Sequence, residues 1–331
     1  MKAYVQRTFG GPDGLELTDV PAPVPAAGEV LVRVHATSVN PYDWHLLRGE
    51  PRVARLMMTD LVGLRAPKFG VPGCDLAGQD AAIGPGVTQF GPGDDVFALV
   101  SHGSYAEYAT VPETLLARLP GNLSFEEAAA VPMAALTALI GLRDTGRVEP
   151  GQQVLVNGAS GGVGTFAVQI ARALGATVTG VCSARNADLV RSLGADSVVD
   201  YTSEDFTRKG RRYDVILDNA GGHSTWACRR ALTPKGTLVI VGGPNGRWLQ
   251  PVGHVLGGVA LAPFVRQRVT VADITRHRDP KGLLTTLTEL METGKVTPVI
   301  DRRYPFTEIS EAVSYQEEGH AAGKVTVTVA G

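Results

Sequence analysis

A glycine-rich segment in the middle of the chain has the residue types and spacing of a phosphate-binding loop. Residues 154–175 read VLVNGASGGVGTFAVQIARALG, where an apolar run leads into closely spaced glycines and an amphipathic run follows at once. Glycines suit such a turn because a pyrophosphate must approach bare backbone and face the N–H groups that begin a helix. The segment predicts dinucleotide binding through Gly158, Ser160, Gly161, Gly162, Val163 and Gly164.

The end of the next predicted strand, TVTGVC at 177–182, indicates which dinucleotide is bound. Enzymes that use NAD place an Asp or Glu about 20 residues after the glycine motif, where it accepts from the ribose hydroxyls. Here Ser183 and Arg185 follow the strand, and no acid occurs before Asp188. A hydroxyl and a guanidinium favour a 2′-phosphate. We therefore expect NADPH, with Tyr201 at the end of the third strand as a second phosphate contact.

The same loop also matches G-x-S-x-G, the nucleophile elbow of serine hydrolases. Ser160, Asp218 and His254 follow in the chain order that such enzymes use. This alternative leaves Gly164 and the end of the following strand unexplained, so dinucleotide binding is preferred. A short-chain dehydrogenase is disfavoured because no tyrosine is followed by lysine four residues later.

Two sequence patterns must position this loop. Residues 1 to about 123 are short apolar runs broken by Pro and Gly, which predict a mostly antiparallel β domain with a short helix between Pro51 and Pro72. From there on, apolar strands alternate with helices, the first opened by a capping box of Ser124 and Glu127, and predict a doubly wound parallel sheet. The tail KVTVTVAG alternates like a strand of the β domain. We expect a discontinuous domain of 1–123 and 278–331, with an inserted domain of 124–277.

The composition argues against several classes of protein. Lys and Arg number 31 against 33 Asp and Glu, for a net charge of −2, so a nucleic-acid partner is not expected. Three cysteines are too few for a disulfide framework or a four-cysteine zinc lobe. The uncharged stretch 128–142 is too short to span a membrane, and the N-terminus lacks the apolar core of a signal peptide. We expect a cytoplasmic protein without a membrane partner.

Several motifs together resemble the medium-chain dehydrogenase/reductase superfamily. They are VLVRVHATSVNPYDWHLLRG (30–49), GCDLAG (73–78), FGPGDDVFAL (90–99), GSYAEY (103–108), AAAVPMAALTA (128–138), NGASGGVG (157–164) and GHAAGKVTVTV (319–329). The chain is most similar to the zinc-free quinone oxidoreductases, the zeta-crystallin-like branch that includes enone and alkenal reductases. The resemblance implies a GroES-like catalytic domain closed by the C-terminal strand, a Rossmann domain, a cleft between them, and homodimers or homotetramers.

The branches of this superfamily differ in whether they bind a catalytic zinc ion. The resemblance to zinc alcohol dehydrogenases places their Cys, His and Cys ligands at Asn40, Cys74 and Met133. An amide, a thiol and a thioether do not supply three strong zinc ligands. An improvised site of His45, Cys74 and Asp75 is disfavoured, since neighbours in a strand point to opposite faces. We therefore expect no metal.

These residues favour reduction of an activated acceptor. Without a Lewis acid, oxidation of a plain alcohol lacks its alkoxide stabiliser. A quinone or an α,β-unsaturated carbonyl can take a hydride once it is positioned and a donor steadies the developing charge. We expect NADPH-dependent reduction of a small hydrophobic quinone or enone. A dedicated biosynthetic enoyl reductase and a non-catalytic NADPH-binding protein remain alternatives.

The resemblance also suggests residues around the reacting groups. Asn40 and Thr137 would lie beside the nicotinamide, and the predicted cofactor site further includes Asn219, Gly242 and Lys324. Candidate donors to the substrate oxygen are Tyr42, His45 and Tyr105, for each of which a packing role is the alternative.

The sequence allows more than one role for several other segments and residues. Trp248, in PNGRWLQP, is a possible wall of the substrate pocket. The apolar arm 51–69 suits a hydrophobic acceptor, and equally plain packing or a subunit contact. Asp43 is expected to be a structural residue. Asp80 stands where an apolar or neutral residue is expected, and Asn219 replaces the more usual ending of its strand.

Overall fold

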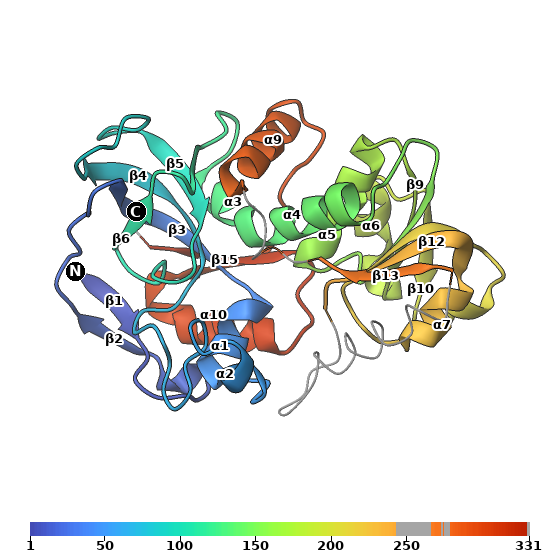
Figure 1. The fold of residues 1–331 in the computed structure, drawn as a ribbon, viewed down its shortest axis with the longest axis horizontal. Helices are drawn as coiled ribbons and strands as arrows, with labels where there is room; N and C mark the ends of the chain where they lie inside the picture. Colours follow the sequence, from blue (N-terminus) through green and yellow to red (C-terminus); the bar gives the residue numbers. More distant parts are fainter. Residues whose placement is uncertain (243–265, 273, 275–278, 330–331) are drawn as a thin grey trace. The chain divides into compact units, whose positions relative to one another are not determined.

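The structure is a computed structural model of the chain, and it describes residues 1–242, 266–272, 274 and 279–329. The chain forms two compact units, shown as a ribbon in Figure 1. The first comprises residues 1–133, 278–293 and 298–331, and the second comprises residues 134–277 and 294–297.

These bounds differ from the predicted domains at two places. Residues 124–133 group with the first unit because α3 (Phe125–Ala129) packs against β3 (Glu29–Val39), β4 (Asp75–Ile83) and β15 (Lys324–Thr328). Residues 294–297 group with the second unit, where the side-chain amide of Gln169 donates to Thr297 O at 2.9 Å and accepts from Thr297 N at 2.8 Å.

The first unit is built on a seven-stranded sheet in the order β14-β15-β3-β4-β5-β7, with β6 also paired to β3. Its strand β3 has the period-2 pattern expected of a half-buried strand, with Val30, Val32 and Val34 inside and Arg33 outside. As predicted, the C-terminal strand β15 joins this sheet, antiparallel to β3 (Figure 1). The remaining strands are β1 (Lys2–Val5), β2 (Glu16–Asp19), β5 (Asp95–Leu99), β6 (Tyr108–Pro112), β7 (Leu116–Arg118) and β14 (Ile300–Pro305).

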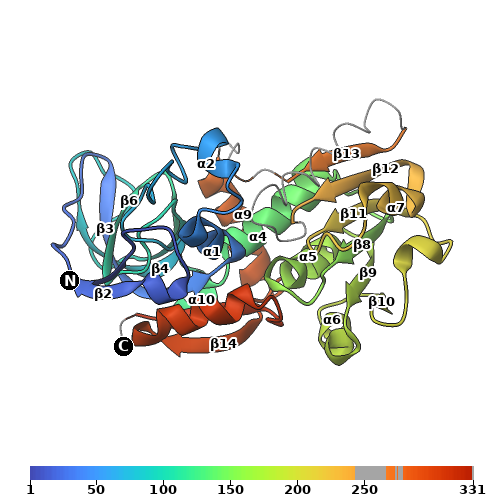
Figure 2. The ribbon, with the colours of Figure 1, turned by 90° about the horizontal axis from the view of Figure 1, so that it is seen from below.

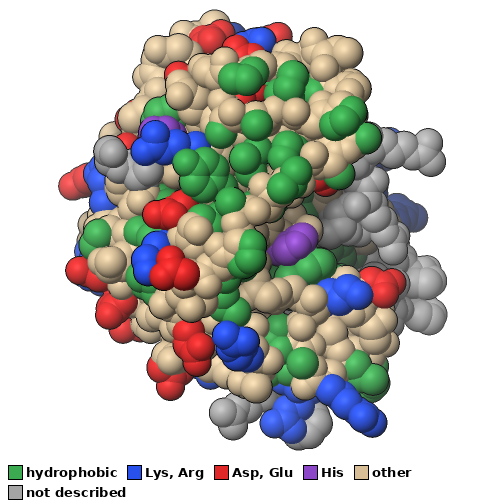
Figure 3. Space-filling view, turned by 90° about the vertical axis from the view of Figure 1, so that its left-hand side faces the viewer, with side chains coloured by type: hydrophobic (Ala, Val, Ile, Leu, Met, Phe, Trp, Pro, Cys, Tyr) green, Lys and Arg blue, Asp and Glu red, His purple; other side chains and the backbone are tan. Residues whose placement is uncertain are grey.

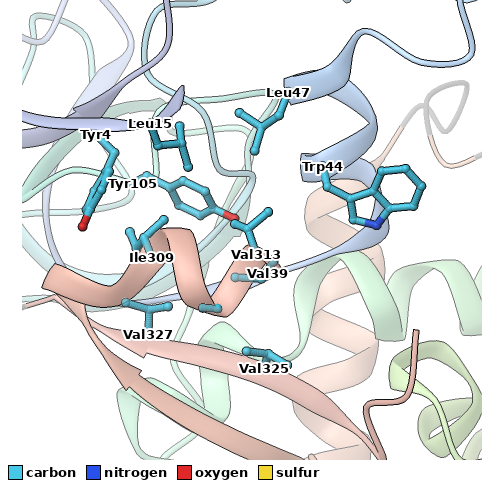
Figure 4. Packing of buried hydrophobic residues seen from close by; sticks show 11 residues of the cluster. Tyr4, Leu15, Val39, Trp44, Leu47, Tyr105, Ile309, Val313, Val325 and Val327 are labelled. Atoms are coloured by element: carbon cyan, nitrogen blue, oxygen red, sulfur yellow. The ribbon is translucent and has the colours of Figure 1, made fainter. Parts of the chain in front are cut away.

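Helices of the first unit enclose an apolar cluster beside the sheet. Helix α1 (Pro41–Arg48) packs on α10 (Ile309–Glu317), as Figure 2 shows. Side chains from these helices, β3, β15 and the N-terminal segment meet around Tyr105, as Figure 4 shows. The other helical elements are η1 (Pro12–Gly14), α2 (Ala54–Met57), α9 (Pro280–Glu292) and η7 (Phe306–Glu308). The expected capping box at Ser124 is present, with Ser124 N donating to Glu127 Oε2 at 2.8 Å.

The second unit is the predicted doubly wound sheet, six-stranded and parallel, in the order β10-β9-β8-β11-β12-β13. The order reverses at β8, and right-handed crossovers then put helices on both faces. Figures 1 and 2 show α5 and α7 on opposite sides of the sheet. The strands are β8 (Gln153–Asn157), β9 (Thr177–Cys182), β10 (Ser197–Asp200), β11 (Tyr213–Asp218), β12 (Leu232–Ile240) and β13 (Arg268–Val271). The helical elements are α4 (Pro132–Leu139), η2 (Ile140–Thr145), α5 (Gly162–Ala173), η3 (Ala184–Asn186), α6 (Ala187–Ser192), η4 (Phe206–Arg208) and α7 (Thr225–Arg230).

The described surface agrees with the balanced charge of the chain. On the face in Figure 3, acidic and basic side chains are interleaved around hydrophobic ones. Within the ranges that the structure describes, no helix combines the length and apolar content required to cross a membrane.

Candidate active site

One part of the candidate site lies in the first unit, where β3 ends and α1 starts. Asn40 is the N-cap of α1, and its backbone N–H donates to Asp43 Oδ2 at 2.7 Å. Pro41 follows at the first helical position, where its missing N–H costs nothing. Asp43 is therefore structural, as expected. Because its carboxyl is 1% exposed, burial raises its pKa to about 7.

Asp75, the first residue of β4, is the centre of a buried polar network. Its Oδ1 accepts from Met133 N at 2.8 Å, and its Oδ2 accepts from Ser38 Oγ at 2.6 Å and Asn40 Nδ2 at 2.9 Å. Lys324, the first residue of β15, brings an ammonium to Asp75 Oδ2 at 3.3 Å and also donates to Asn40 Oδ1. The network thus joins Asn40 and Lys324, both predicted cofactor residues, in the interior of the first unit.

The three positions aligned with zinc ligands converge on this network. Asn40 Nδ2 lies 3.4 Å from Cys74 Sγ, and Met133 is bound through its backbone N–H. The expectation that Cys74 and Asp75 point apart is wrong, since Asn40 Nδ2 contacts both side chains. Cys74 precedes the first residue of β4, so strand alternation does not separate the pair. Burial raises the pKa of the Cys74 thiol, which favours the protonated form over the thiolate that binds metals.

The structure separates the three predicted donors. Tyr42 is half-buried near this network, and burial raises its pKa, so its hydroxyl keeps its proton at neutral pH. His45 stacks on Trp44 with ring centroids 3.7 Å apart, and its Nδ1 lies 3.1 Å from Glu50 O. Burial lowers the pKa of His45, so the ring is neutral at pH 7.

Tyr105 is fully enclosed in the apolar cluster of Figure 4. Its hydroxyl has no hydrogen-bond partner in the part of the chain that the structure describes. A side chain without exposed surface cannot reach a substrate in this conformation, so the structure favours the packing alternative for Tyr105. Tyr42 keeps a protonated, partly exposed hydroxyl, whereas a neutral His45 that donates from Nδ1 to Glu50 O has no proton left on Nε2.

A hollow opens beside α1 in the first unit. Asp43 and Leu46 line it from α1, Val62 and Phe69 from the arm, and Ser101 and His102 from the loop after β5. The carboxyl of Asp43 thereby borders the polar network on one side and the hollow on the other.

The predicted phosphate loop in the second unit has the required geometry. It runs from Gly158 (φ +79°), a value that favours glycine, to the start of α5 at Gly162. A methyl group at Gly164 would lie 2.0 Å from Gly158 O, so that position is closed to any side chain. At Gly161 the nearest atom would be 3.6 Å away. Packing within the protein therefore does not require a glycine at position 161. The close approach of a ligand to the backbone explains why a glycine is present there.

The segment after β9 contacts this loop. Ser183 is the N-cap of η3, which contains the exposed Arg185, and Asn186 Nδ2 donates to Ser160 Oγ at 3.1 Å. Tyr201 is 62% exposed, and its N–H donates to Cys182 O at 3.1 Å. Sequence reasoning missed Asn186, whose only signal is its place one residue after Arg185.

The carboxyl end of β11 supplies an unsatisfied polar group. Both atoms of the Asn219 amide are buried and have no partner among the described residues, which fits a site where a bound group completes the bonding. Gly242 approaches Asn219 so closely that a methyl group there would lie 2.3 Å from Asn219 O. The residues present therefore fit a dinucleotide. Thr137 lies in α4 and is 9% exposed.

Two residues named in the sequence analysis, Trp248 and His254, lie outside the described residues. The other two residues of the hydrolase alternative, Ser160 and Asp218, have other hydrogen-bond partners. Ser160 Oγ accepts from Asn186, whereas Asp218 Oδ1 accepts from Asn157 Nδ2 at 2.7 Å and Gly221 N at 2.9 Å.

Comparison with known proteins agrees with this geometry. The alcohol dehydrogenase GroES-like domain matches residues 26–121, and the zinc-binding dehydrogenase domain matches residues 193–327. The chain is 35% identical to the chloroplast envelope quinone oxidoreductase homolog of Arabidopsis thaliana, over 96% of this chain and 95% of that protein. It is also 35% identical to the NADPH-dependent alkenal/one oxidoreductase, chloroplastic, of the same species, over 99% of this chain and 79% of that protein.

A solved structure shares the whole fold. The quinone oxidoreductase from Coxiella burnetii superimposes with a TM-score of 0.85 and 29% identity, over 100% of this chain and 99% of that one. The chain belongs to the medium-chain dehydrogenase/reductase superfamily, among its quinone oxidoreductases and enone reductases, and is an oxidoreductase that uses a nicotinamide cofactor.

Proposed function

We propose that the protein is a zinc-independent, NADPH-dependent reductase that transfers a hydride to a quinone or to the β-carbon of an α,β-unsaturated carbonyl. The observation that carries this proposal is the buried network of Asn40, Asp75 and Lys324. An ammonium and an amide are hydrogen-bonded around one carboxylate, and the amide is that of Asn40, a position that the resemblance assigns to a zinc ligand.

The donor chemistry of this network supports zinc independence. Asn40 offers an amide that is already bonded to Asp75, and Cys74 is a buried thiol whose pKa is raised by burial. Among the residues that the structure describes, no three His, Cys, Asp or Glu side chains gather in a way that could hold a metal ion. The charge of Asp75 is already balanced by Lys324 at 3.3 Å. A reaction that needs no Lewis acid therefore fits these residues best.

The preference for NADPH is supported by the residues that follow β9. Ser183 and the exposed Arg185 lie there with no acid before Asp188. A guanidinium and a hydroxyl suit a 2′-phosphate, whereas NAD enzymes place an acid at this point. The curated relative named NADPH-dependent alkenal/one oxidoreductase is consistent with this choice.

The residues of this chain then have distinct tasks. When bound, the reduced nicotinamide supplies the hydride. The loop 158–164 holds the pyrophosphate at the start of α5, and Asn219 hydrogen-bonds to the bound dinucleotide. The resemblance assigns Asn40 and Thr137 to the nicotinamide. Tyr42, kept protonated by burial, donates to the acceptor oxygen as negative charge develops there.

Reduced-nicotinamide absorbance with a panel of acceptors tests the proposal. We expect turnover of NADPH with a benzoquinone, a naphthoquinone, a 2-alkenal or a cyclic enone, and none of a primary alcohol with oxidised cofactor. Arg185→Ala should raise KM for NADPH about tenfold or more, as for a lost hydrogen bond to a charged group, and leave KM for NADH unchanged. Arg191→Ala, on the following helix α6, is the matched control.

The alternatives give different results. A dedicated biosynthetic enoyl reductase would bind NADPH but leave this panel unreduced until its own enoyl substrate is supplied. A non-catalytic protein would be thermally stabilised by NADPH and reduce no acceptor. Equal KM values for NADPH and NADH in the unaltered protein would contradict the cofactor preference.

A further inference from the structure

The arm, residues 51–69, exposes a cluster of large apolar side chains. Among the described residues, nine large hydrophobic side chains are exposed, and four of them lie in the nine positions from 56 to 64. Their exposed fractions are 72% for Leu56, 68% for Met57, 44% for Met58 and 50% for Leu64. This exposure argues against plain packing, one of the roles that the sequence left open. A concentrated apolar patch on a soluble surface marks an interaction site.

The arm is held in place by its other residues. Arg55 stacks its guanidinium 3.9 Å from the centroid of the Phe9 ring and donates to Gly49 O at 2.7 Å and Arg48 O at 2.8 Å. Val62 is 6% exposed, and Lys68 N donates to Val62 O at 3.1 Å. Figure 2 shows α2, which carries Leu56 and Met57, at the edge of the first unit.

The charge of the arm identifies its partner. The arm contains four basic residues, Arg52, Arg55, Arg65 and Lys68, against one acid, Asp60, so it carries +3 in a chain of net charge −2. Exposed apolar side chains beside basic ones are the combination that binds anionic lipid surfaces. A second copy of the chain fits less well, because a two-fold interface would bring two arms of charge +3 together.

We propose that the arm docks on an anionic lipid bilayer, with Leu56, Met57, Met58 and Leu64 entering the interface and the exposed side chains of Arg52, Arg65 and Lys68 facing the headgroups. This differs from the sequence-based expectation of no membrane partner, which rested on the lack of a spanning segment. Docking would give a lipid-dissolved acceptor access to the enzyme, a benefit that rests on the proposed reductase function.

Flotation of the full chain with vesicles tests the docking surface. We expect binding to vesicles of phosphatidylcholine mixed with phosphatidylserine, little binding to phosphatidylcholine alone, and release by high salt. Arg52→Gln with Arg65→Gln should weaken binding about 25-fold, since one basic residue near an anionic surface contributes about fivefold. Leu56→Ser with Met57→Ser should also weaken it. Val24→Ser, at a side chain that is 85% exposed outside the arm, should not.

Other outcomes would overturn the proposal. These are no binding to either vesicle, equal weakening by Val24→Ser, or a fall in molecular mass on Leu56→Ser with Met57→Ser without vesicle binding, which would assign the arm to a second copy. Circular dichroism of each variant checks folding. Reduction of a water-soluble quinone by the unaltered chain, measured without vesicles, reports on the reductase alone, so the two proposals fail separately.

Discussion

Lys324 and Asp75 form an ion pair in the interior of the first unit, with 3.3 Å between Nζ and Oδ2 and side chains that are 3% and 0% exposed. The pair joins the first residue of the C-terminal strand β15 to the first residue of β4. The same ammonium donates to Asn40, the residue that caps α1. The C-terminal segment therefore completes the polar network of the candidate site as well as the sheet.

Removing one partner of this pair should be costly. Lys324→Met leaves Asp75 buried without its cation, and we expect a loss of about 3–5 kcal/mol in the free energy of unfolding, measured with urea. Lys2→Met removes an ion pair with Asp19 whose side chains are 50% and 74% exposed, and should change stability little. If both variants lose the same stability, the network is not a buried electrostatic unit. Asp75→Asn added to Lys324→Met should restore part of the loss.

Asp80 should make the protein less stable as pH rises. Its side chain is buried, neither carboxyl oxygen has a hydrogen-bond partner among the described residues, and burial raises its pKa to about 7. The unfolded pKa is about 3.9, so between pH 4 and pH 7 unfolding releases a proton and stability falls with rising pH. Above pH 7 both states are ionised and the loss is complete.

Urea unfolding of Asp80→Asn measures this effect. From pH 4 to pH 8 the variant should gain about 4 kcal/mol relative to the unaltered protein, which corresponds to about three pKa units. Asp188→Asn, at a side chain that is 99% exposed on α6 of the second unit, is the control and should show no such gain. A difference that stays constant with pH would mean that Asp80 is ionised in the folded state at all these values.

Alanine substitutions at two glycines of the phosphate loop should have different effects, one on NADPH binding and the other on stability. Gly161→Ala meets nothing closer than 3.6 Å, so stability should be unchanged, while the Kd for NADPH should rise about tenfold or more because the dinucleotide approaches the backbone there. Gly164→Ala would put a methyl group 2.0 Å from Gly158 O and should destabilise the unit itself. Calorimetry and thermal unfolding measure the two effects. Unchanged NADPH binding by Gly161→Ala would remove that glycine from the site.

Substitution of Tyr42 and of Tyr105 by phenylalanine should affect kcat differently. Tyr42→Phe removes the proposed donor to the developing negative charge, and we expect kcat to fall about a hundredfold to a thousandfold with a quinone. Tyr105→Phe removes a buried hydroxyl that has no partner among the described residues, so kcat should stay the same and thermal stability should be unchanged or higher. Equal loss of kcat in both would mean that Tyr105 reaches the substrate in another conformation.

The fold could be predicted because its signals are local. The glycine loop lies between an apolar strand and an amphipathic helix, and the alternation of KVTVTV predicts a strand of the first domain. The sequence also predicts the capping box at Ser124 correctly, but the helix that it begins belongs to the first unit and not to the second, because the contacts of α3 with β3 and β4 are tertiary.

Much of the candidate site could not be predicted because its contacts span the chain. Asp75 and Lys324 are 249 residues apart, and no local pattern links them. Tyr105 lies in a motif that resembles active reductases, yet its burial depends on Leu15, Ile309 and Val313 from distant segments. The exposure of Leu56 and Met57 could not be predicted either, because an apolar sequence of this kind occurs in packed segments as well as on surfaces.

Turnover after metal removal separates a zinc-independent reductase from a zinc enzyme. The protein is treated with a strong chelator, its metal content is measured, and NADPH oxidation with a naphthoquinone is followed by absorbance. We expect unchanged kcat in metal-free protein, because Asn40 stands at one of the positions that the resemblance assigns to zinc ligands and its amide is bonded to Asp75 and Lys324. Activity that disappears with the metal and returns when zinc is added back would contradict it.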